Sequence, residues 1–183
     1  MKSKFLAGCM ALMFFSGANL FAADKPKVSF NGTEFTLAFV TTQQTFVMNE
    51  YVVKGETVDT WSQLITIEAF PKVDSPIDMA QRVVGLAQKE GILATKPQLL
   101  VRPGTNKGDD IALFIILADR QRQVLEFNVQ RYVKEPGATG VKAYIYGRHI
   151  APAEGNPKPE EINTWVKALW EMKAPIYEKE PAN

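Results

Sequence analysis

A run of apolar residues at positions 111–118, IALFIILA, constrains the fold of this chain more than any other feature of the sequence. A strand with both faces buried is apolar at consecutive positions, whereas apolar and polar residues alternate along a strand with one solvent-exposed face. Residues 124–133 and 141–150 do alternate. We therefore expect 111–118 to be a central strand covered by helices on both sides, followed by two strands that each present one polar face.

Other strands are expected on either side of this group. Residues 28–30 and 35–40 flank Asn31-Gly32, a pair that favours the type I′ turn of a β-hairpin. Strands are also predicted at 62–70 and 98–102. Residues 41–50 are polar, and Tyr51-Val52-Val53 is short, so a strand there is left open.

Two helices complete the predicted fold. Ser75 is placed to cap a helix that has Pro76 at its first position and ends near Gly91. A second helix is expected over about 159–174, stopped by Pro175. Hairpin-length connections join the last strands. Together these elements predict an α+β fold with a mainly antiparallel β-sheet of about six to seven strands, packed by two main helices.

The N-terminal residues have the order of a secretory signal peptide. Lys2 and Lys4 precede an apolar stretch, and small residues follow it up to Ala23. We expect a cleavable signal peptide at 1–22 with cleavage between Ala22 and Ala23, a single globular domain at 23–177 and a charged tail at 178–183. The expected location is the periplasm, or the medium after secretion.

Two other uses of this N-terminus stay open. Residues 5–23 approach the length of an uncleaved membrane anchor, although Ser16, Gly17 and Asn19 interrupt them. Residues 6–9, LAGC, resemble the lipobox of a bacterial lipoprotein, but few residues precede Cys9. Cleavage after Ala22 would leave no transmembrane span.

Cleavage at this site would also exclude several classes of function. It removes two of the 21 Lys and Arg side chains and the only Cys, so that the formal charge falls from +1 to −1. A chain without Cys has no disulfide and no thiol nucleophile. Near-neutral charge without a basic block argues against nucleic acid as a partner.

The order of strands and helices, the export signal and a closing helix with Trp165 and Trp170 carry a family resemblance. Over residues 28–175 the chain resembles the PsbP-like and DcrB-like exported proteins. The resemblance implies a PsbP-like α/β/α sandwich and a noncatalytic binding or assembly role at a membrane. It transfers no functional residue, because no motif matches position by position.

The sequence offers little conventional catalytic chemistry. His149 is the only histidine and is expected at a strand end with one partner; no serine lies in the G-x-S-x-G motif of a hydrolase. We therefore predict no catalytic residue, no metal and no cofactor. Acidic residues do cluster at 50–59 and at Asp109-Asp110, so a carboxylate-based periplasmic hydrolase remains the alternative.

Two candidate binding surfaces follow from the alternating pattern and from the segment before Trp61. The first is a polar and aromatic strand face, composed of Glu126, Asn128, Gln130, Tyr132, Tyr144, Tyr146 and Arg148. The second is a possible cleft rim, composed of Glu50, Tyr51, Glu56, Asp59 and Trp61. For each there is a structural alternative: the tyrosines belong to a covered core, and residues 57–61 form a turn that seats Trp61 in the core.

These observations favour a periplasmic noncatalytic binding or interaction protein. An envelope accessory factor and an inhibitor of an envelope-targeted toxin both fit this description. The expected partner is another envelope protein or a small ligand.

Overall fold

The structure is a computed structural model that describes residues 25–106, 108–119, 124–134, 137 and 139–179. The expected signal peptide lies outside the described residues. Within them, no helix has the length and apolar character needed to cross a membrane.

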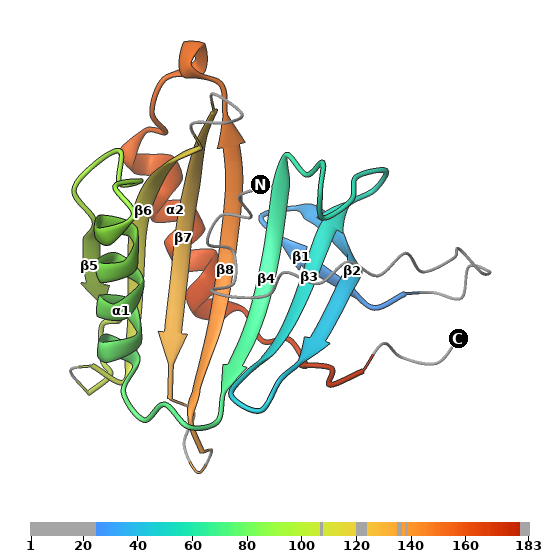
Figure 1. The fold of residues 1–183 in the computed structure, drawn as a ribbon, viewed down its shortest axis with the longest axis vertical. Helices are drawn as coiled ribbons and strands as arrows, with labels where there is room; N and C mark the ends of the chain where they lie inside the picture. The colour runs from blue at the N-terminus through green and yellow to red at the C-terminus, as the bar shows by residue number, and fades with distance from the viewer. Residues whose placement is uncertain (1–24, 107, 120–123, 135–136, 138, 180–183) are drawn as a thin grey trace.

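Eight strands of the described chain form one antiparallel sheet in the order β1-β2-β3-β4-β8-β7-β6-β5 (Figure 1). With the two helices, this is the expected α+β class. The strands are β1 (Lys27–Phe30), β2 (Thr33–Thr42), β3 (Val47–Val53), β4 (Gln63–Phe70), β5 (Gln98–Val101), β6 (Asp110–Asp119), β7 (Val124–Val133) and β8 (Val141–Ile150).

The prediction of six to seven strands was too low because β3 is longer than its sequence suggested. It begins at Val47 and carries Asn49 and Glu50 in its middle. Asn49 is buried between apolar neighbours, and its polar group is satisfied by a distant segment described below. A strand that buries polar residues does not stand out by hydrophobic periodicity.

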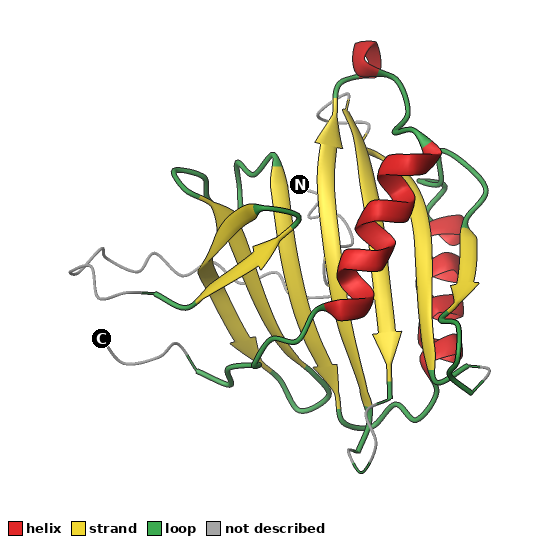
Figure 2. Cartoon of the chain, turned by 180° about the vertical axis from the view of Figure 1, so that it is seen from behind, coloured by secondary structure: helices red, strands yellow, loops and turns green. Residues whose placement is uncertain are grey.

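The two helices lie on opposite faces of the sheet, over the half that contains β6, β7 and β8. Helix α1 (Pro76–Lys89) begins as predicted, with the Ser75 hydroxyl accepting a hydrogen bond from the Asp78 amide at 3.3 Å. Helix α2 (Pro159–Glu171) lies on the other face (Figure 2). It follows a short 3-10 turn, η1 (Pro152–Glu154), and ends three residues earlier than expected.

Strand β6 has both faces buried, as its apolar run predicts. Ile111, Leu113 and Ile115 belong to the core under α1, and Phe114 and Ile116 belong to the core under α2. The strand is second from the edge of the sheet, however, and not at its centre. Helices over this half of the sheet, together with β5 along the edge, are sufficient to bury it.

The sheet curls strongly toward the α2 side. Strands lie about 4.8 Å apart, so β1 and β8 would be about 19 Å apart in a flat sheet. Yet the ring centroids of Phe30 in β1 and Tyr146 in β8 are 4.7 Å apart. A register shift in β2 between Leu37 and Phe39 marks a bulge, which increases local bending. We call the α2 side the concave face and the α1 side the convex face.

Candidate functional site

The expected polar and aromatic strand face does not form as one surface. Val129 lies opposite Tyr146, and Gln130 lies opposite Ile145. Directly opposed residues of antiparallel strands share a face. The β8 members of the expected surface, Tyr144, Tyr146 and Arg148, therefore lie on the concave face, and the β7 members lie on the convex face. A common face for both sets would need a register that is shifted by one residue.

The members on the concave face belong largely to the core. Tyr144 and Tyr146 are buried, and the Tyr146 hydroxyl donates to Gln63 Oε1 at 2.9 Å. Burial raises the pKa of Tyr146 to about 12, an effect that neighbouring Arg148 opposes. Arg148 Nη2 lies 3.3 Å from Glu154 Oε2 in an ion pair near the surface.

The members on the convex face form a buried polar row. Asn128 Nδ2 donates to Glu126 Oε1 at 3.1 Å, and the Tyr132 hydroxyl donates to Gln130 Oε1. All four side chains are buried. Asn128 Oδ1 is buried without a hydrogen-bond partner among the described residues. The row is covered by other parts of the chain, as in the alternative of a covered core.

The expected rim residues do not surround one cleft either. Glu50 and Tyr51 are neighbours in β3 and so lie on opposite faces of the sheet. Asp59 is exposed in a turn. Glu56 accepts hydrogen bonds from the Ser62 amide at 2.9 Å and from the Ser62 hydroxyl, so its carboxylate closes the turn.

Trp61 is seated in the core after this turn. It is 8% exposed and stacks on His149 with ring centroids 3.7 Å apart. His149 Nδ1 lies 2.9 Å from the Trp61 carbonyl oxygen. Trp61 therefore follows a turn and is buried, as in the structural alternative for residues 57–61, and His149 lies one residue before the end of β8.

Two carboxyl groups come together on the convex face, and one of them belongs to Glu50, a residue of the expected rim. Glu68 lies opposite Met48, and Glu50 lies opposite Thr66, which places the two glutamates diagonally across β3 and β4. Burial, and then the neighbouring Glu50 charge, raises the pKa of Glu68 to about 8. In the described residues, no group of His, Cys, Asp and Glu side chains could hold a metal ion.

The concave face contains a cleft of about 900 Å³ where α2 ends over β7 and β8. Its walls come from the loop before β6, from these two strands and from the chain that follows α2. The residues that line it are Arg102, Gly104, Thr105, Asn106, Asp109, Asp110, Arg131, Val133, Lys134, Lys142, Tyr144, Trp170, Glu171, Met172, Lys173, Ala174 and Pro175.

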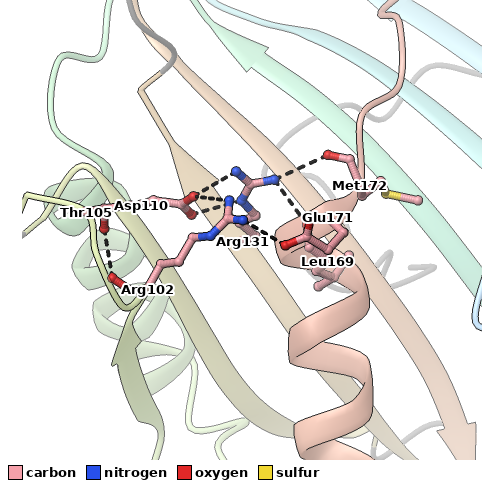
Figure 3. Close-up of polar contacts among 7 residues, drawn as sticks. All are labelled: Arg102, Thr105, Asp110, Arg131, Leu169, Glu171 and Met172. Carbon is pink, nitrogen blue, oxygen red and sulfur yellow. Dashed lines mark hydrogen bonds and ion pairs between the residues drawn. The ribbon is translucent and has the colours of Figure 1, made fainter.

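A buried ion pair forms the floor of this cleft (Figure 3). Arg131 Nε donates to Asp110 Oδ1 at 2.8 Å, and its Nη2 donates to Asp110 Oδ2 at 2.7 Å. Both side chains are buried. A bidentate (two-pronged) ion pair of this kind fixes the guanidinium in position and orientation.

The same guanidinium caps the end of α2. Arg131 Nη1 donates to the carbonyl oxygens of Leu169 and Met172, at 3.1 and 3.3 Å. Carbonyls in the last turn of a helix lack partners and carry partial negative charge. Pro175 also disfavours helical geometry at the residue before it. These two effects explain why α2 ends at Glu171 and does not continue to 174.

A second arginine links the loop to the helix across the cleft. Arg102 Nη1 lies 3.2 Å from Asp110 Oδ2, and Arg102 Nη2 lies 2.8 Å from Glu171 Oε1 (Figure 3). The Thr105 hydroxyl donates to the Arg102 carbonyl at 2.9 Å. Loop, strands and helix are therefore tied together around two carboxylates.

Aromatic side chains and lysines complete the cleft. The Arg131 guanidinium lies 5.5 Å from the centroid of the Tyr144 ring. The buried Nε1 of Trp170 makes no hydrogen bond within the described part of the chain. Lys142 and Lys173 add positive charge at its walls.

Sequence reasoning missed this site. Its strongest signal is Arg131, which follows Leu125, Phe127 and Val129 at the same two-residue period and puts a charge where the pattern calls for an apolar side chain. A buried charge needs a partner, but only the pairing of β6 with β7 shows that Asp110 supplies it.

Comparison with known proteins places the chain in a family. A family model matches residues 22–174. The chain belongs to this family, which is uncharacterised. No curated protein and no solved structure matches the chain. The resemblance to PsbP-like and DcrB-like proteins thus gains no support from these comparisons.

Loss of the central arginine is expected to destabilise the fold. Arg131→Met should lower the free energy of unfolding by about 3–5 kcal/mol, because the buried Asp110 charge loses its main partner and the last carbonyls at the end of α2 lose their cap. Urea denaturation measures the change. Arg148→Met is the control, since its ion pair is more exposed and should cost about 1 kcal/mol or less. Equal losses in the two variants would contradict this role of Arg131.

Stability is expected to fall as the pH rises from about 5 to 8. The Glu68 carboxyl releases its proton near pH 4.5 when unfolded but keeps it up to about pH 8 in the fold. The folded state therefore binds more protons in this window, and a rising pH favours unfolding by up to about 1.4 kcal/mol per pH unit. Urea denaturation at several pH values should show this slope.

Glu68→Gln should flatten the slope, because the amide does not titrate. Glu34→Gln, at an exposed surface pair with Lys27, should leave it unchanged. A slope that persists in the Glu68→Gln variant would show that another group causes the pH dependence.

Proposed function

We propose that this chain is an exported, noncatalytic binding protein that holds an anionic ligand with an aromatic or apolar body in the concave cleft. The observation that carries the proposal is the combination of aromatic side chains, Tyr144 and Trp170, with lysines in the lining of a cleft of about 900 Å³. This volume suits a small ligand, and binding sites of this kind join apolar walls to a few placed polar groups.

The charge around the cleft favours an anion. Three acidic side chains, Asp109, Asp110 and Glu171, face the two arginines and three lysines that line it. Arg102 and Arg131 are engaged with Asp110 and Glu171. Lys134 also lies 3.8 Å from Asp74, which is outside the lining. The lining itself carries two more basic than acidic side chains, which favours a positive potential in the cleft.

Trp170 supports the same ligand class. Its indole N–H is a donor without a partner among the described residues, and the side chain lines the cleft. An unpaired buried donor is costly, so a turn of the indole that brings this N–H to a ligand oxygen in the cleft would be favourable. Trp170 and Tyr144 also offer flat apolar surface to the body of such a ligand.

The carboxylates of the cleft are poorly suited to the alternative, a hydrolase. Asp110 is held by Arg131 and Arg102, and Glu171 is held by Arg102. Carboxylate oxygens that already accept hydrogen bonds from arginines are not free to take a proton from a substrate. Glu50 and Glu68 lie on the convex face, so they do not face the cleft. The proposed periplasmic location rests on the signal-like residues 1–22.

Titration with 8-anilinonaphthalene-1-sulfonate, which joins a sulfonate to an aromatic body, tests the proposal. We expect one saturable site, detected by dye fluorescence. Lys142→Gln/Lys173→Gln should weaken binding at least tenfold, because two charges near the sulfonate are lost.

The matched control is Lys54→Gln/Lys72→Gln, which removes the same net charge at exposed positions that do not line the cleft. It should bind the dye like the wild type. Absence of a saturable site, or equal weakening in the two double variants, would contradict binding in the cleft.

A further inference from the structure

The chain after α2 forms an extended tail along the concave face. Residues 173–179 leave the helix and run toward β3 and β2 (Figure 2). The Thr42 hydroxyl, at the end of β2, donates to the Glu178 carbonyl. Ala174, Ile176 and Tyr177 pack against the core of the concave face.

One buried side chain holds this tail by its backbone. Asn49 Nδ2 donates to the Tyr177 carbonyl oxygen at 2.8 Å, and the Tyr177 amide donates to Asn49 Oδ1 at 2.7 Å. Asn49 is fully buried. An amide side chain that pairs with both the N–H and the C=O of one residue recognises an extended backbone without regard to its side chain.

We call the part of the concave face that the tail covers, over β2 and β3, the groove, and it keeps an unused polar group. Tyr51, two residues along β3 from Asn49 and on the same face, is fully buried, and its hydroxyl has no hydrogen-bond partner among the described residues. Tyr177 lies near enough to contribute to the raised pKa of Tyr51. The tail thus satisfies the Asn49 amide but leaves one hydroxyl of the groove unpaired.

The start of the tail also separates two hollows. Residues 171–175 line the cleft described above and, on the other side, a pocket of about 440 Å³ against β1. That second pocket includes Phe30 and Lys27. Displacement of the tail would join the cleft and the pocket against β1.

We infer that the concave groove over β2 and β3 is a binding site for an extended peptide segment of a partner protein, and that the chain's own tail occupies it in cis. The contacts of the tail show what the groove recognises: one extended residue paired with Asn49, a neighbouring carbonyl bound by Thr42, and apolar side chains facing the core. This inference does not depend on ligand binding in the cleft.

Occupation in cis means that a partner peptide has to compete with the tail. A segment tethered by a short linker acts at an effective concentration in the millimolar range. The wild-type chain should therefore bind a free peptide weakly, and weakening the tail should open the groove.

A labelled peptide with the tail's own sequence, KAPIYEK, tests the inference on the full chain. Tyr177→Pro removes the N–H that pairs with Asn49 and should release the tail. By fluorescence anisotropy, we expect this variant to bind the peptide at least tenfold more tightly than the wild type. Lys179→Pro, which places the same residue beyond the anchored position, should behave like the wild type.

Two further variants show where the peptide binds. Added to Tyr177→Pro, Asn49→Ala should weaken peptide binding at least tenfold. Thr42→Val should weaken peptide binding by a smaller factor. Because Thr42 is exposed, this variant should fold even if Asn49→Ala does not. Equal affinity in the wild type and Tyr177→Pro, or no loss with either groove variant, would overturn the inference.

Sedimentation separates this inference from tail exchange between two copies. A Tyr177→Pro variant that stays monomeric and binds the peptide supports a partner segment as the occupant. If the wild type dimerises and the free peptide dissociates the dimer, the groove takes the tail of a second copy. That result would overturn the inference.

Discussion

The buried pair of Arg131 and Asp110 is the interaction on which the concave side depends. One guanidinium joins β6, β7 and the last carbonyls of α2 through four hydrogen bonds. Burying two charges is expensive, and geometry of this quality is needed to offset the cost. The apolar packing of Trp165 and Leu169 holds α2 on the sheet, but Arg131 fixes where the helix stops.

The end of α2 in turn shapes both of the proposed binding surfaces. Because the helix stops at Glu171, the next residues are free to extend, and they wall both the cleft and the pocket against β1. The extended chain then reaches Asn49, whose amide holds Tyr177. The cleft and the peptide groove thus both depend on one helix terminus. The proposed ligands differ in chemistry: an anion in the cleft and an extended backbone in the groove.

Local signals in the sequence were sufficient for much of the fold. Asn31 and Gly32 have the positive φ angles of the predicted hairpin turn, and Ser75 caps α1 as expected. What could not be predicted depends on pairing between distant strands. The register of β7 with β8 divides the expected binding face, and the pairing of β6 with β7 brings Asp110 to Arg131. Polar residues that are satisfied only in three dimensions, such as Asn49, give no periodic signal.

Amide hydrogen exchange in Arg131→Lys tests the central role of this arginine most directly. Lysine keeps the charge but cannot form the two-pronged pair or cap two carbonyls at once. We expect amides in the last turn of α2 and the Tyr177 amide to lose protection together, by at least tenfold, while α1 amides keep theirs. Unchanged protection at Tyr177, or an equal loss in α1, would contradict that role.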